Sequence, residues 1–85
     1  PEISRFFGIV IKMFFEDHPI PHIHAEYSGD KAKFAIRTGE VIKGKLSPRA
    51  ERLVREWIEL HQAELLENWQ RSENMQALRK IEPLD

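Results

Sequence analysis

The dipeptide Ser47-Pro48 divides this 85-residue chain into two parts with different hydrophobic periods. Serine caps a helix by accepting a backbone N–H bond, and proline suits the first helical position because a donor there would have no partner. Beyond it, apolar residues recur at helical spacing, at Ala50, Leu53, Val54, Trp57, Ile58, Leu65 and Trp69. We predict one α+β domain: a β-meander at residues 1–46, one long helix at 47–72, packed on one face of the sheet, and a docking tail at 73–85.

The β-meander is predicted to contain about four antiparallel strands. The first, at residues 3–15, is long and apolar on both faces, and Gly8 marks a bend or bulge in it. Alternation places Phe6 and Phe14 on the face away from the core. A helix of about 25 residues would be ~37 Å long, against ~20 Å for a typical strand. We therefore expect it either to overhang the sheet or to bend near His61-Gln62.

Two turns connect the later strands. A two-residue loop at Gly29-Asp30 would place Glu26 opposite Lys33, an attractive pairing of opposite charges. Thr38-Gly39 then leads into a strand at residues 40–45, through a loop of either two or three residues. In the three-residue case Ile42 and Leu46 would join Ile23, Phe34 and Ile36 on the face toward the core.

Three of the four histidines, His18, His22 and His24, lie within seven residues. Pro19 and Pro21 restrict the backbone just ahead of the His-x-His pair. In an extended strand, side chains two residues apart project from the same face. The two imidazoles of the pair are therefore expected to lie side by side.

This pattern has two interpretations. Neutral imidazole is the commonest protein ligand for metals, so the His-x-His pair with Glu26, and His18 or Asp17 as a further ligand, would suit a divalent ion such as Zn, Ni or Mn. Alternatively, the histidines lie on a polar sheet face and Glu26 pairs with Lys33. A metal-dependent enzyme, such as a nuclease acting through His22 and His24, follows from the first interpretation.

The outer sheet face combines aromatic and basic residues. Such a surface is typical of single-stranded RNA platforms and also of dimer interfaces; the candidate residues are Phe6, Phe14, Lys33 and Arg37. Arg49 and Arg52, near the helix start, would bind an acidic partner or belong to a face of solvated ion pairs. The net charge of −1 argues against attraction of the whole molecule to nucleic acid.

Residues 1–11, 17–27, 49–57 and 80–84 together resemble the small bacterial family known as domain of unknown function 4160. The Pro-His segment followed by Ala25-Glu26-Tyr27 is the most specific part of the likeness. The resemblance implies a cytoplasmic bacterial protein, which the absence of cysteine also suits. It also implies a neighbouring gene for another small domain, an organisation like that of toxin–antitoxin pairs. It supplies no reaction and no catalytic residue.

We therefore expect a protein-binding module that self-associates or pairs with the product of a neighbouring gene. A metal-dependent enzyme is the alternative, and an RNA-binding sheet without catalysis is the third interpretation. No apolar run exceeds three residues, so no membrane-spanning segment is expected. The sequence shows no signal peptide pattern.

Overall fold

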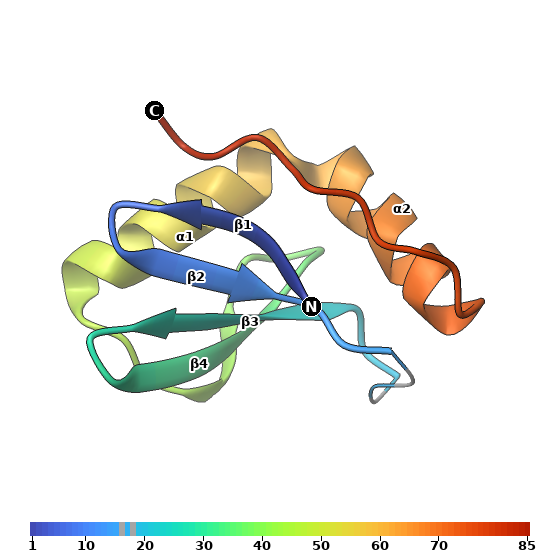
Figure 1. The fold of residues 1–85 in the computed structure, drawn as a ribbon. Helices are drawn as coiled ribbons and strands as arrows, with labels where there is room; N and C mark the ends of the chain where they lie inside the picture. The colour runs from blue at the N-terminus through green and yellow to red at the C-terminus, as the bar shows by residue number, and fades with distance from the viewer. Residues whose placement is uncertain (16, 18) are drawn as a thin grey trace.

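The computed structural model describes residues 1–15, 17 and 19–85, in which an antiparallel sheet carries two helices on one face (Figure 1). The strands lie in the sheet in chain order: β1 (Glu2–Phe6), β2 (Ile9–Lys12), β3 (His22–Tyr27), β4 (Asp30–Ala35) and β5 (Val41–Gly44). The helices are α1 (Pro48–Leu60) and α2 (Gln62–Glu73). The α+β class is confirmed. The described part of the chain has five strands and two helices, where about four strands and one helix were predicted.

The first predicted strand is in fact a hairpin. Phe7 and Gly8 both have positive φ, at 50° and 80°, and Phe6 faces Ile9 across the turn. Positive φ at both central residues is the mark of the tight type I′ turn, which glycine adopts readily. The reversal changes the face on which β1 side chains lie, so the predicted outer placement of Phe6 is wrong. Its ring is 5% exposed and packs in the core, 5.4 Å from that of Trp57.

The turn between β3 and β4 comes one residue earlier than predicted. Ser28 and Gly29 are the positive-φ pair, at 51° and 86°, so Gly29 takes the second turn position that type I′ favours for glycine. Glu26 consequently faces Lys31 instead of Lys33. The register shift is two residues, and an even shift leaves each side chain on its predicted face.

The connection between β4 and β5 differs from both predicted loops. The Ala35 N–H donates to the Glu40 carbonyl at 2.9 Å, which closes a loop of residues 36–39. A bulge follows, because Lys33 pairs with Lys43 while Phe34 pairs with Val41. The extra residue is Ile42, which a three-residue loop would have placed toward the core and which is instead 47% exposed, whereas Leu46 is buried.

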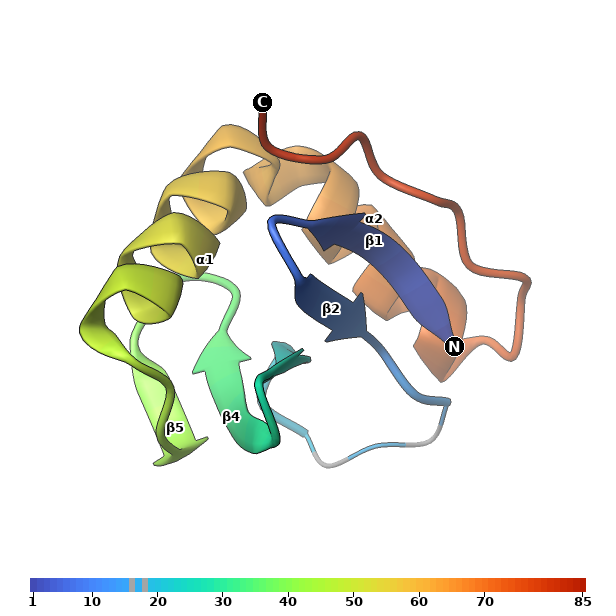
Figure 2. The same ribbon diagram turned by 60° about the vertical axis from the view of Figure 1, so that its left-hand side comes forward.

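The helices form an arch over the sheet, as Figure 2 shows with β5 at the left and β1 at the right. The Ala50 N–H donates to Oγ of Ser47 at 3.2 Å, so the serine caps α1 as the sequence predicts. The break between α1 and α2 falls at His61, where φ is −119° and ψ is 29°. The excess length of a single helix predicted either an overhang or a bend at this place, and the structure has the bend. Neither helix is long and apolar enough to cross a bilayer.

The tail after α2 passes back over the helices toward β1 (Figure 2). The Ile81 N–H donates to the Ile3 carbonyl at 2.8 Å, and Trp57 Nε1 donates to the Glu82 carbonyl at 2.9 Å. Ile81 and Leu84 are buried in the same core as Trp57. Met75, near the start of the tail, is 61% exposed.

Candidate metal centre

The two histidines of β3 converge with Asp17, which comes from the connection between β2 and β3. Nε2 of His22 lies 3.1 Å, and Nε2 of His24 2.9 Å, from the same Oδ2 atom of Asp17. Strand alternation explains why the imidazoles lie side by side, with ring centroids 5.1 Å apart. The buried side chains of Ile23 and Ala25 point to the opposite face of the strand, into the core.

The backbone fixes the orientation of the His22 ring. Nδ1 lies 2.6 Å from the Ile20 carbonyl oxygen, which can only accept, so Nδ1 carries hydrogen and donates. A neutral ring would then point the lone pair of Nε2 at the Asp17 carboxylate. Two lone pairs repel at that distance, and a cation bound by both atoms would relieve the repulsion. Metal-bound histidines are commonly held in this way, with the other ring nitrogen donating to a backbone carbonyl.

Aromatic neighbours restrict both imidazoles. His22 is 4% exposed, and its ring centroid lies 5.2 Å from that of Trp69 on α2. The His24 ring meets Phe14 edge to face at 4.6 Å. These contacts limit ring rotation, so the two nitrogen donors have little freedom to diverge.

Burial lowers the pKa of His24 below its ordinary value, because the buried environment disfavours the charged imidazolium. The Asp17 carboxylate opposes this shift, while the nearby His22 and Lys33 add to it. The net effect favours the neutral imidazole of His24 at pH 7, and only the neutral form can ligate a metal.

Asp17, His22 and His24 therefore offer one oxygen and two nitrogen atoms that all lie within 4.8 Å of one another. Two imidazoles and a carboxylate suit zinc, nickel or manganese. Glu26, the carboxylate that strand alternation favoured, lies on the same face of β3 but its Oε2 bonds Lys12 Nζ at 3.1 Å. His18, another predicted ligand, lies outside the described residues. Asp17 was one of two alternatives that the sequence offered for the further ligand. The sequence did not choose between them, because no periodic pattern indicates where the side chain of a loop residue points.

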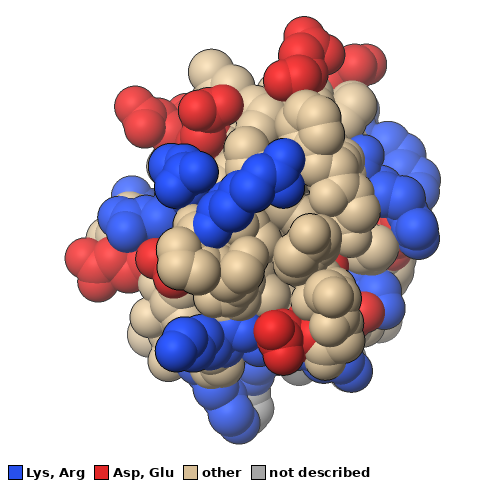
Figure 3. Space-filling model, turned by 90° about the vertical axis from the view of Figure 1, so that its left-hand side faces the viewer, with Lys and Arg blue, Asp and Glu red and all other residues tan. Residues whose placement is uncertain are grey.

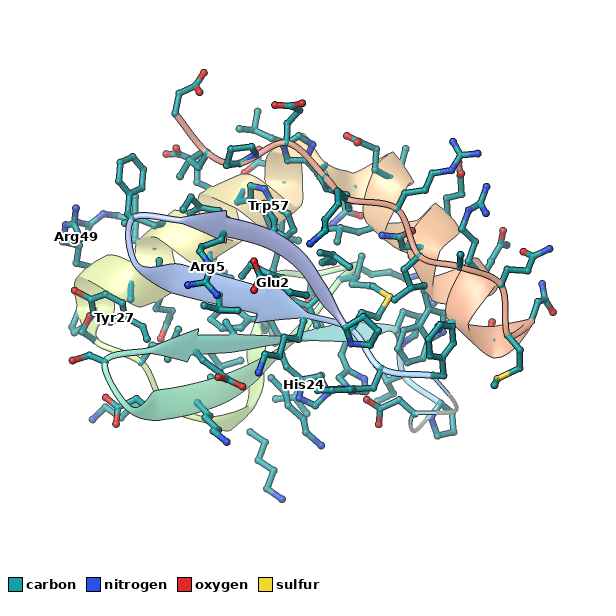
Figure 4. The ribbon with its side chains drawn as sticks, in the orientation of Figure 1. Glu2, Arg5, His24, Tyr27, Arg49 and Trp57 are labelled. Carbon is teal, nitrogen blue, oxygen red and sulfur yellow. The ribbon has the colours of Figure 1, made fainter. Side chains whose placement is uncertain are left out.

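The other predicted site residues are dispersed. Lys33 faces His24 directly across the β3–β4 pair. Arg37 is exposed at the loop before β5, beside a hollow of about 350 Å³ that Arg55 and Glu59 also line. Arg49 and Arg52 are exposed on α1, and Figure 4 shows Arg49 well separated from His24. No single surface combines these cations with Phe6.

The fold and this cluster define a small α+β protein with a candidate metal centre at one end of its sheet. The chain belongs to the DUF4160 family, described as a domain of unknown function, whose model matches residues 8–70. The resemblance seen in the sequence is thereby confirmed, and the matched range contains all three residues of the cluster. No curated protein and no solved structure matches the chain.

Proposed function

We propose that this protein binds one divalent transition-metal ion through Asp17, His22 and His24. The supporting observation is that both Nε2 atoms lie about one hydrogen-bond length from the same carboxylate oxygen, at 3.1 and 2.9 Å. An ion bound by these three groups would relieve the repulsion between the Nε2 lone pair of His22 and the carboxylate. It would also compensate for the burial of that imidazole.

The number of ligands bears on what the ion would do. Structural zinc sites are usually closed by four protein ligands, whereas catalytic sites have three and accept a further ligand from solution. Among residues 1–15, 17 and 19–85, Asp17, His22 and His24 make a set of three. With these three as its protein ligands, the ion would accept a further ligand or act as a Lewis acid, which is the role the metal-dependent enzyme hypothesis requires.

The test is calorimetric titration of untagged, chelator-treated protein with Zn²⁺, Ni²⁺ and Mn²⁺. We expect one ion per chain, and a rise in melting temperature when the ion is added, because binding to the folded state alone stabilises it. Asp17→Asn and His24→Ala should each weaken binding by at least about tenfold.

His61→Ala is the matched control for this titration. His61 is a partly buried imidazole whose Nδ1 lies 2.6 Å from Glu64 Oε1, so it too pairs with a carboxylate, but on the helices. It should bind metal as the wild type does. Absence of binding for all three ions, or an equal loss in His61→Ala, would contradict the proposal.

A further inference from the structure

A row of basic side chains crosses the sheet beside the candidate metal centre. Lys12 faces His24, His24 faces Lys33, and Lys33 faces Lys43, across β2, β3, β4 and β5. Directly paired residues project from the same face of a sheet, so these four side chains form one line, here called the lysine row. Figure 4 shows His24 below the strands and Trp57 above them, toward α1, so the row lies on the face that the helices leave open.

Charge in the lysine row is only partly balanced. Lys12 Nζ lies 3.1 Å from Glu26 Oε2. Lys33 and Lys43, in contrast, form no ion pair with a carboxylate in residues 1–15, 17 and 19–85. Like charges placed directly opposite each other destabilise a sheet. A bound anion between Lys33 and Lys43 would turn this repulsion into attraction.

Two hollows flank the unbalanced lysines and connect them to the metal ligands. One, of about 380 Å³, is lined by His22 and Lys33, with four further residues, Pro19, Ile20, Ile42 and Lys43. The other, of about 220 Å³, is lined by His24, Glu26, Lys31, Lys33 and Lys43, among others. An anion held by Lys33 and Lys43 would therefore lie next to an ion held by the two imidazoles.

The larger hollow also offers an apolar surface. Ile20 is 62% exposed and Ile42 47% exposed, and both line it. The bulge in β5 and the proline-flanked loop before β3 place these two side chains beside the cations. Apolar side chains next to paired lysines suit a ligand that combines a flat, weakly polar group with a phosphate.

We propose that Lys33 and Lys43 bind the phosphate of a nucleotide, either free or within a single strand, with its base against Ile20 and Ile42. This assignment rests on the proposed metal function, because the ion would neutralise the phosphate from the side of His22 and His24. Basic side chains elsewhere do not form a competing continuous patch on the face in Figure 3, where blue and red side chains are interspersed.

The test is fluorescence anisotropy of a labelled single-stranded RNA of about ten nucleotides, a typical length for such sites. It is run with and without Zn²⁺, and with a mononucleotide and inorganic phosphate as competitors. Lys33→Gln/Lys43→Gln should weaken binding about tenfold and reduce the salt slope by about 1.4, or ~0.7 per lost phosphate contact. Its Zn²⁺ titration should match that of the wild type, because neither lysine is a ligand.

Arg49→Gln/Arg52→Gln is the matched control, since it also removes two positive charges, but from exposed positions on α1. It should bind RNA within about twofold of the wild type. Competition by a mononucleotide at low concentration would support a free nucleotide as ligand, and competition by the strand alone would support a nucleic acid.

Three results would overturn the phosphate assignment: no binding of any phosphate ligand at low salt, unchanged binding by the lysine variant, or an equal loss in the arginine control. Failure of the metal proposal is distinguishable from these. The wild type would then take up no Zn²⁺, while an affinity for RNA that depends on Lys33 and Lys43 without metal would still support the lysine row.

Discussion

Two glycines with nearly the same backbone conformation differ in what surrounds them. Gly44 has φ of 79° and Gly29 has φ of 86°. A Cβ atom at Gly44 would collide with the backbone carbonyl oxygen of Lys31, whereas a Cβ at Gly29 would meet nothing within 4 Å. Both positions require positive φ, so the collision at Gly44 is what distinguishes the effect of a substitution there from one at Gly29.

We expect Gly29→Ala to lower the free energy of unfolding by about 1–2 kcal/mol, the penalty for an L-residue at positive φ. Gly44→Ala should cost at least about 2 kcal/mol more, because the backbone of β4 must move to make room. Urea denaturation of both variants measures the difference. Equal losses would show that β5 shifts away from β4 without cost.

The lowered pKa of His24 makes stability depend on pH. Because burial disfavours its imidazolium in the folded protein, the unfolded chain binds this proton more readily. The stabilisation is therefore complete above the unfolded pKa of ~6.5 and is lost as the pH falls through the lower folded pKa. In metal-free protein, NMR titration of the His24 ring should give a midpoint below 6.5. A midpoint at or above that value would mean that the Asp17 carboxylate outweighs burial.

At the scale of the elements, the tail depends on one buried amide of α2. Asn68 Nδ2 donates to the Arg79 carbonyl at 2.8 Å, and the Arg79 N–H donates to Asn68 Oδ1 at 3.0 Å. Asn68 is 1% exposed. The side chain thus supplies both a donor and an acceptor to a segment outside any helix or strand, just ahead of the contact between Ile81 and Ile3.

Asn68→Ala should lower the free energy of unfolding by about 2–3 kcal/mol, because it leaves both backbone groups of Arg79 unpaired. Hydrogen exchange should quicken at residues 79–84 in particular. Gln70→Ala, an exposed amide on the same helix, is the control and should change stability by less than about 0.5 kcal/mol. Unchanged exchange in the tail of Asn68→Ala would mean that Ile81 and Leu84 hold it without the amide.

At the scale of the whole molecule, the helices cover one face of the sheet and leave the other open. The candidate metal centre and the lysine row share this open face, next to the end of β3 that α2 reaches through Trp69. Self-association, and pairing with the product of a neighbouring gene, stay predictions. A face-to-face dimer through the lysine row would bring unbalanced lysines together, so an interface elsewhere is the better candidate.

The sequence by itself determined the features that depend on neighbours along the chain. The cap and proline at Ser47-Pro48 start α1, and the helical spacing that follows places the apolar residues on one side of the helix. The His-x-His alternation places two imidazoles side by side. Each of these follows from a local periodicity or a local hydrogen bond. Family membership was also visible in the sequence, because its motifs are contiguous.

Only the tertiary structure decided which other residues pack against or contact these elements. The hairpin at Phe7-Gly8 buries Phe6, the bulge in β5 exposes Ile42, and the connection before β3 brings Asp17 to the imidazoles while Lys12 engages Glu26. The physical reason is that a bulge, or a register shift by an odd number of residues, moves every later side chain of the strand to the opposite face at small local cost. The position of each turn or bulge is selected by the packing of the whole sheet against Trp57 and the rest of the core. No short stretch of the sequence specifies that packing.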